Sequence, residues 1–205
     1  MLLRTGTGAV LVAGTGFAYW WYSLPTIACA WAILFFLMLR YEWPAFKMGW
    51  LTPLYPGISM ISIILLHLYA ATWICVATLL MAAGADTGGY FIGQRWGKHP
   101  IAYAISPGKS WEGFFGGYVM TIGVVYGMVW WYVLPYQWFG ILCLSTYGAI
   151  FALGGDLFES YLKRRAGLKN SGTVLPGHGG CFDRLDSVFG VAPGMLLWWL
   201  VVHCR

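Results

Sequence analysis

Charged residues are scarce in this sequence. Only 9% of its 205 residues are Asp, Glu, Lys or Arg, whereas 60% are hydrophobic. So little charge, together with a mean hydropathy of +0.68, excludes an ordinary soluble globular domain and indicates a protein that crosses a membrane several times. No linker or internal repeat divides the sequence, so we expect a single domain over residues 1–205.

The motifs of several common protein classes are absent as well. The five cysteines form no CxxC pair and no Cys/His spacing typical of zinc sites. The net charge of +5 is not gathered in a basic tail or a basic amphipathic helix, so we expect no nucleic-acid partner. The sequence around Lys109 reads GKS, but a Walker A loop needs a glycine where Tyr103 stands, which excludes a P-loop nucleotide site.

Hydrophobic segments are plentiful, and most approach the roughly 17–25 residues that a membrane-spanning helix needs. They cover residues 8–24, 26–40, 52–69, 70–92, 113–134, 139–158 and 188–203. We therefore predict an all-α, polytopic integral membrane protein with about seven transmembrane helices. With the N-terminus inside, eleven of the twelve Lys and Arg residues fall on the cytoplasmic side. This bias predicts cytoplasmic polar loops and an active site that faces the cytoplasm from the inner (plasma) membrane.

One polar stretch, residues 154–187, holds four of the seven acids and five of the twelve bases. Charged groups are costly beside hydrocarbon, so their concentration here predicts a functional site. Two acids, Asp86 and Asp156, lie within or at the end of apolar segments and beside glycines that would let a helix or a ligand approach closely. A polar contact between helices is the simpler alternative for either acid alone.

The acids Asp183 and Asp186 stand three residues apart, which places them on one face of a helix. Oxygen ligands without His or Cys suit Mg²⁺ shared with substrate phosphates, so this pattern indicates phosphoryl chemistry. Other groups could bind phosphate or move a proton; they are Lys163, Arg164, Arg165, Lys169, the glycine turn 176–180 with His178, and Ser106, Lys109 and Ser110. The three consecutive bases would equally serve as a topology signal at a helix end.

Five ordered stretches resemble the motifs of the phosphatidate cytidylyltransferases, the CDP-diacylglycerol synthases. They are Asp86-Thr87-Gly88, residues 106–113 (SPGKSWEG), residues 155–160 (GDLFES), residues 160–169 with Lys163, Arg164 and Lys169, and residues 175–186 (LPGHGGCFDRLD). The resemblance covers about residues 80–190, which is therefore the expected catalytic part.

The resemblance implies a nucleotidyltransferase of phospholipid biosynthesis. Such an enzyme transfers CMP from CTP to phosphatidic acid among the membrane lipids, giving CDP-diacylglycerol and pyrophosphate, with Mg²⁺ alone or with a second cation. Asp156 and Asp183 match acids that hold metal in the family. With these two acids, the implied catalytic residues are Lys163, Arg164 and His178. The implied substrate-binding residues are Ser106, Lys109, Ser110, Lys169, Gly179, Gly180, Arg184, Asp86 and Asp186.

Two positions depart from the family's motifs. Asn170 stands where the family has an acid after the lysine, and Cys181 stands where an apolar residue usually follows the glycines. The missing carboxylate predicts a higher Mg²⁺ requirement. Two other functions stay open on the sequence: a CTP-dependent enzyme acting on another lipid phosphate or a polyprenol, and a transporter using Asp86 and Asp156. A homodimer is also left open.

Overall fold

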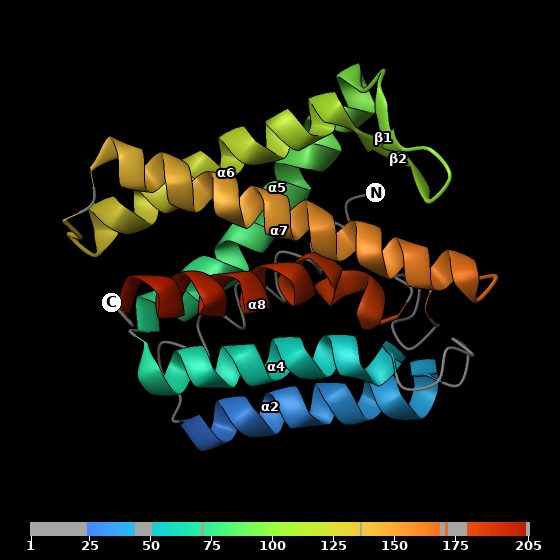
Figure 1. Cartoon of the computed structure of the whole chain (residues 1–205), viewed down its shortest axis with the longest axis horizontal. Helices are drawn as coiled ribbons and strands as arrows, with labels where there is room; N and C mark the ends of the chain where they lie inside the picture. Colours follow the sequence, from blue (N-terminus) through green and yellow to red (C-terminus); the bar gives the residue numbers. More distant parts are fainter. Residues whose placement is uncertain are drawn as a thin grey trace.

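The computed structural model describes residues 24–43, 51–70, 72–135, 137–168, 171 and 180–203. Helices make up most of this part of the chain (Figure 1). They are α2 (Leu24–Leu37) with its π-helical continuation η1 (Met38–Glu42), α4 (Leu51–Tyr69), α5 (Thr72–Trp96), α6 (Trp111–Trp131), α7 (Trp138–Arg165) and α8 (Phe182–His203). The predicted helical architecture is thus found, with one small sheet added to it.

The helix α8 lies at the centre of the arrangement. It packs against α4, α5 and α7, and Figure 1 shows α2, α4, α8 and α7 in neighbouring rows while α5 crosses behind them. Residues on α8 such as Phe189, Val191 and Met195 are completely buried. The last described helix of the chain therefore supplies much of the hydrophobic core.

Glycines let α7 and α8 approach each other closely. A Cβ atom on Gly155 would lie 2.5 Å from the backbone oxygen of Asp186, and one on Gly190 would lie 2.8 Å from the Cα of Gly155. No side chain fits at such distances, so the two backbones pack directly against each other. This contact fixes the separation between the acids that α7 and α8 carry.

Four described helices, α5, α6, α7 and α8, are long and apolar enough to cross a membrane. Each predicted segment from residue 26 onward coincides with a helix, and α4 forms a shorter apolar one. The predicted segment at 8–24 lies almost entirely outside the described residues. The structure therefore supports a membrane protein built of helices, whereas the count of seven spans stays a prediction.

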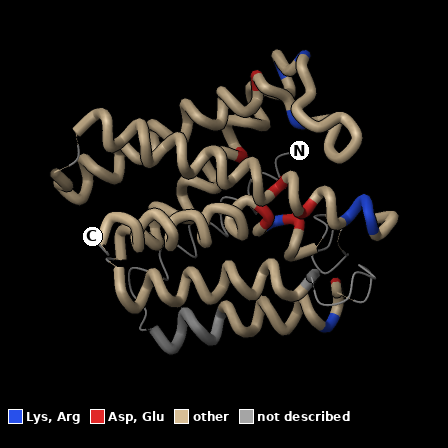
Figure 2. The backbone as a smooth tube through the Cα atoms, in the orientation of Figure 1, with Lys and Arg blue, Asp and Glu red and all other residues tan. Residues whose placement is uncertain are grey.

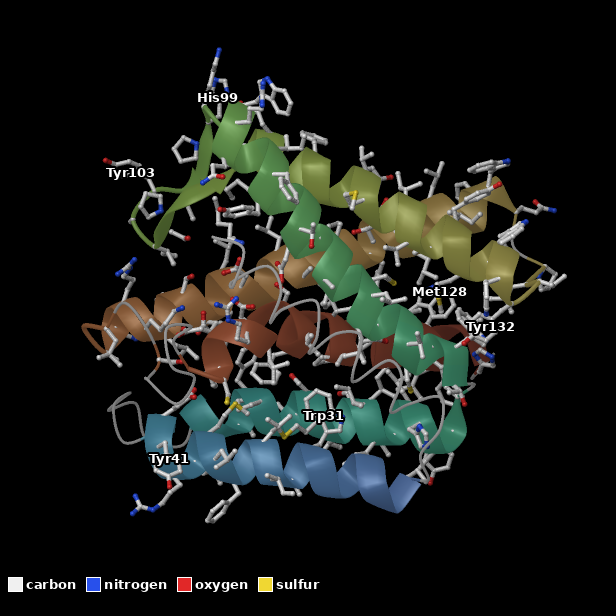
Figure 3. The ribbon with its side chains drawn as sticks, turned by 180° about the vertical axis from the view of Figure 1, so that it is seen from behind. Trp31, Tyr41, His99, Tyr103, Met128 and Tyr132 are labelled. Carbon is white, nitrogen blue, oxygen red and sulfur yellow. The ribbon has the colours of Figure 1, made fainter. Side chains whose placement is uncertain are left out.

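A β-hairpin replaces part of the polar loop predicted between the fourth and fifth segments. Strand β1 (Pro100–Ala102) pairs antiparallel with β2 (Ser106–Ser110). At the end of β2, the Ser110 Oγ accepts a hydrogen bond from the Gly113 N–H at 3.1 Å and so caps α6. Figure 3 shows His99 and Tyr103 at this hairpin, far from Met128 and Tyr132 at the other end of α6.

The helix α7 continues past its predicted end at residue 158, as far as Arg165. Its last two turns are polar, and they are supported by an ion pair one turn apart between Glu159 and Lys163. The basic residues 163–165 consequently belong to the last turn of a helix, where positive charge is favourable.

Candidate active site

Acidic and basic residues of the described part of the chain gather at one end of the helix bundle (Figure 2). They belong to η1, the middle and end of α5, the hairpin, the start of α6, the C-terminal part of α7 and the N-terminal part of α8. The opposite end of the bundle shows almost no charge in the same view. One polar end on an otherwise apolar helical protein is where a site for a polar substrate is expected.

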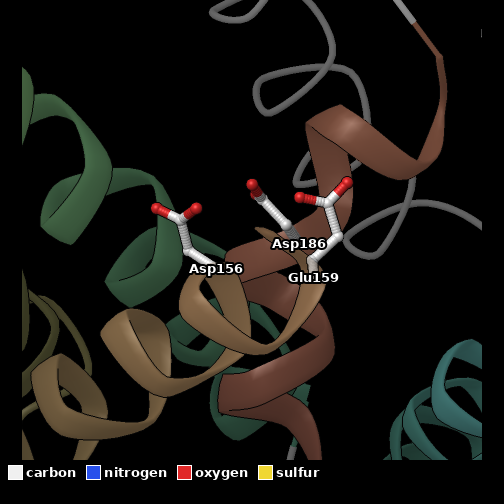
Figure 4. Close-up of side chains that lie close together, drawn as sticks. All are labelled: Asp156, Glu159 and Asp186. Atoms are coloured by element: carbon white, nitrogen blue, oxygen red, sulfur yellow. The ribbon is translucent and has the colours of Figure 1, made fainter. Parts of the chain in front are cut away.

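The carboxylates of three acids at this end lie close together (Figure 4). Asp156 and Glu159 lie three residues apart on α7, and Asp186 reaches them from α8; one oxygen of each lies within 4.8 Å of the others. Glu159 is fully buried, and its Oε1 has no hydrogen-bond partner among the described residues. An orphaned carboxylate oxygen within a group of oxygen ligands fits a hard divalent cation such as Mg²⁺.

A lysine from the hairpin approaches the same acids. The Lys109 Nζ forms an ion pair with Asp156 Oδ2. Burial alone would lower the pKa of Lys109, but the nearby carboxylates of Asp156 and Asp86 outweigh it and raise this pKa above its ordinary value. Lys109 therefore stays positively charged at neutral and alkaline pH.

Lys109 and Asp156 line a cavity of about 470 Å³ between α5, α6, α7 and the hairpin, whereas Glu159 and Asp186 are not among its lining residues. Its polar wall includes Asp86, Lys109, Ser110 and Asp156, and Gly108 leaves backbone exposed beside them. The volume lies within the range of about 300–1,000 Å³ that is usual for small-molecule sites. The cavity thus combines the positive side chain of Lys109, two carboxylates and room for a ligand of nucleotide size.

A second lysine bridges two acids behind this cavity. Lys163 Nζ lies 2.7 Å from Glu159 Oε2 and 2.9 Å from Asp183 Oδ1. Asp183 also accepts hydrogen bonds at 3.0 Å from the backbone N–H groups of Ser171 and Gly180. Asp183 was expected to share a metal with Asp156. In the structure it lies outside the group of three acids, and its carboxylate binds Lys163 and two backbone N–H groups.

The remaining intramembrane acid, Asp86, joins α5 to α8. Its Oδ1 accepts a hydrogen bond from the Ser187 hydroxyl at 2.6 Å. The neighbouring Asp186 Oδ1 accepts one from the Ser187 N–H at 2.7 Å. Asp86 thus makes the contact between helices that the sequence offered as the simpler alternative, and it also lines the cavity, while its role toward a substrate stays a prediction.

A comparison with known protein families identifies the family of this chain. The model of the cytidylyltransferase family matches residues 3–202. The chain belongs to the cytidylyltransferase family. This result confirms the resemblance that the five motifs gave.

Individual relatives agree with the family assignment. A phosphatidate cytidylyltransferase of Pseudomonas aeruginosa is 34% identical over 202 residues, which is 86% of this chain and 72% of that protein. Those of Mycobacterium bovis and Bacillus subtilis are 41% and 39% identical over 127 residues each. These two matches cover 60% and 61% of this chain. They span less than half the length of the relatives, 39% and 46%.

Other predicted site residues of this cytidylyltransferase-family chain lie around the same end. The Arg164 Nε donates to the Ile105 carbonyl oxygen at 3.1 Å and so ties α7 to the hairpin. Arg184 lies on α8 between Asp183 and Asp186 in sequence, and Ser106 begins β2. Four predicted or questioned positions lie outside the described residues: Lys169, Asn170, His178 and Gly179.

Two acids near this site were assigned no role from the sequence. One is Glu159, although a spacing of three residues from Asp156 places both on one face of α7. The other is Glu42. In the structure Glu42 is buried and contacts the start of α8, a contact that no local pattern could have indicated.

Proposed function

We propose that this chain transfers CMP from CTP to phosphatidic acid, forming CDP-diacylglycerol and releasing pyrophosphate. The observation that carries the proposal is the group of Asp156, Glu159 and Asp186, whose member Asp156 forms an ion pair with Lys109 and lines with it a cavity of about 470 Å³. Membership of the cytidylyltransferase family and the similarity to phosphatidate cytidylyltransferases support it. The same evidence favours an enzyme over the transporter that Asp86 and Asp156 alone would also suit.

In this reaction an oxygen of the phosphatidate phosphate attacks the α-phosphorus of CTP. The bond from that phosphorus to the oxygen bridging the α- and β-phosphates breaks, and pyrophosphate leaves with the electron pair. Both reactants are anions, so the protein must mainly supply positive charge and correct positioning. Lys109 offers a fixed ammonium group at the cavity wall, where it can stabilise charge that develops on the phosphates.

We propose Mg²⁺ as the cofactor, with Asp156, Glu159 and Asp186 as the residues that would hold it. When bound, Mg²⁺ supplies Lewis-acid stabilisation of the phosphate charges. Asp183 and Lys163 support this group from behind, because Lys163 contacts both Glu159 and Asp183. The predicted direct role of Asp183 as a ligand becomes, in this proposal, a role in holding Lys163 and the start of α8.

We also propose that the protein lies in the inner membrane with its polar end in the cytoplasm. The gathering of charge at one end of the described helices supports a single polar face. The eleven bases on one side of the predicted topology support a cytoplasmic one. This orientation would give the site access to CTP in the cytoplasm and to phosphatidic acid in the adjoining leaflet.

Pyrophosphate release tests the function directly. Purified protein is given CTP and Mg²⁺ with phosphatidic acid, with a polyprenyl phosphate, or without lipid, and both pyrophosphate and the nucleotide-lipid product are measured. We expect the nucleotide-lipid product to form only with phosphatidic acid. The Asp156→Asn variant serves as the control and should form far less product. Product formed only from polyprenyl phosphate would assign another lipid, whereas pyrophosphate release without lipid would contradict transfer to a lipid phosphate.

A further inference from the structure

The carboxylate of Glu42 is buried against the start of α8. Glu42 ends the helical segment formed by α2 and η1, and its exposed fraction is 1%. It accepts hydrogen bonds from the backbone N–H groups of Cys181 at 2.5 Å and Phe182 at 2.9 Å. A third comes from the Ser171 hydroxyl at 3.1 Å. These three donors are all neutral, and they belong to residues at least 129 positions away in the sequence.

The start of α8 needs such an acceptor. The first N–H groups of a helix have no partner within the helix, and Ser, Thr, Asp or Asn usually accepts from them at the capping position. The residue before α8 is Cys181, whose thiol is a poor acceptor. Glu42 from another helix accepts from the first helical N–H group, that of Phe182, and from the Cys181 N–H just before it. Its negative charge also suits the positive end of the α8 dipole.

Ser171 and Glu42 together leave no room for a side chain at residue 180. A Cβ atom on Gly180 would overlap the Ser171 Oγ and lie 2.7 Å from the Glu42 Cδ and Oε2 atoms. The Gly180 N–H meanwhile donates to Asp183 Oδ2 at 3.0 Å. The turn that leads into α8 is therefore held between two carboxylates, Glu42 on one side and Asp183 on the other.

A second contact from the N-terminal helices reinforces the same region. The Tyr55 hydroxyl on α4 lies 3.0 Å from the Gly155 carbonyl oxygen and 3.2 Å from the Asp186 carbonyl oxygen. Gly155 adjoins Asp156, and Asp186 is itself the third acid of the group. The segments before α5 therefore contact the backbone of both helices that carry the acidic group.

We propose that Glu42 is a positioning residue for the active site: it fixes the start of α8 and thereby places Asp183 and Asp186 relative to Asp156 and Glu159. The role is not catalytic, because the Glu42 carboxylate lies outside the acidic group and accepts hydrogen bonds from two backbone N–H groups and a hydroxyl. The inference rests on the proposed function only in taking the acidic group as a divalent-metal site. Residues that orient metal ligands commonly change metal affinity by about 10–100-fold when they are replaced.

The experiment compares Glu42→Gln with the unaltered protein in two measurements. Mn²⁺ binding without substrate is followed by electron paramagnetic resonance, and CDP-diacylglycerol synthesis is followed against Mg²⁺ concentration. The substituted amide retains the size of the carboxylate but presents an N–H₂ group to backbone donors. We expect Mn²⁺ affinity to fall at least about tenfold and the Mg²⁺ requirement to rise similarly, with the KM for CTP at saturating Mg²⁺ nearly unchanged.

A matched control is Ser59→Ala. The Ser59 hydroxyl also bonds α8, donating to the Phe189 carbonyl oxygen at 2.6 Å, but this contact lies beyond Asp186 and away from the start of α8. It should lower thermal stability while leaving Mn²⁺ affinity as in the unaltered protein. Equal losses of Mn²⁺ affinity in Ser59→Ala and Glu42→Gln would overturn the proposal, because any weakened α8 contact would then have the same effect.

A conservative variant covers the case in which Glu42→Gln does not fold. Glu42→Asp keeps the charge but shortens the side chain, so a folded protein with weaker Mn²⁺ binding supports the positioning role. Mn²⁺ binding as tight as in the unaltered protein would overturn it. An unaltered protein that binds Mn²⁺ but makes no CDP-diacylglycerol would refute the proposed function, while the Mn²⁺ titration would still decide the role of Glu42.

Discussion

At the scale of single residues, Asp156 connects the two halves of the candidate site. It belongs to the acidic group with Glu159 and Asp186, and it forms an ion pair with Lys109 from the hairpin. The Asp156 side chain therefore belongs to the proposed metal site and also contacts the lysine of the proposed phosphate site.

Replacement of Asp156 by Asn should lower kcat by at least about a hundredfold, because the shape is kept but a charged ligand is removed. Steady-state assays over a range of Mg²⁺ concentrations measure the effect. Activity close to that of the unaltered protein at saturating Mg²⁺ would show that Asp156 is not a ligand.

Replacement of Lys109 by Ala should reduce kcat/KM for CTP by about a hundredfold, since a fixed positive charge is lost from the cavity. Arg95→Ala, at the end of α5 and outside the cavity lining, is the control and should have little effect. Because the pKa of Lys109 is raised, a Lys109→Arg variant should show the same alkaline limb in its pH profile. An alkaline limb that shifts to higher pH in the Lys109→Arg variant would mean that Lys109 loses its proton during normal turnover.

At the scale of secondary structure, the contact between α7 and α8 sets the geometry of the acids. Gly155→Ala should destabilise the protein by about 1–3 kcal/mol, because the new methyl group would overlap the Asp186 carbonyl oxygen. Gly154→Ala is its control, since nothing lies within 4 Å of a Cβ at that position. Thermal unfolding in detergent measures both; equal melting temperatures would contradict the close contact.

The position of the hairpin depends on Glu112 at the start of α6, which binds the two residues before β1. Glu112 Oε2 accepts from the N–H groups of Lys98 and His99 at 3.1 and 3.3 Å, and Oε1 lies 2.6 Å from His99 Nδ1. Glu112→Gln should therefore loosen the hairpin, speed protease cleavage within residues 98–110 and raise the KM for CTP severalfold. His99→Ala removes only the side-chain contact and should have the smaller effect. Identical cleavage rates for both variants would show that the backbone contacts are unimportant.

At the scale of the whole molecule, the predicted orientation can be tested by labelling. Tyr103 on the hairpin and Phe139 at the start of α7 are exposed and lie at opposite ends. In a protein without other cysteines, a cysteine introduced at position 103 should react with a membrane-impermeant reagent only after the cells are opened. One introduced at position 139 should react in intact cells. The reverse pattern would contradict a cytoplasmic site.

Much of the molecule follows from sequence where the signal is local. Apolar segment lengths predicted the described helices, and the acids within the polar stretch predicted the candidate site. Apolar length, however, says nothing about where a polar helix end stops, so the extension of α7 to Arg165 was missed. The strand β2 was missed because SPGKS contains Pro and Gly and has no alternation of apolar and polar residues. Glu42 was missed because its partners are distant in sequence.

The distance between Glu42 and the start of α8 has a consequence for biosynthesis. Their separation of 140 residues corresponds to roughly 7–28 s of synthesis at about 5–20 residues per second. During this time the Glu42 carboxylate has left the ribosome, but its two backbone donors do not yet exist. The carboxylate must therefore stay hydrated at the membrane surface or take up a proton until α8 is synthesised. The end of the protein that holds the candidate site consequently completes its folding last.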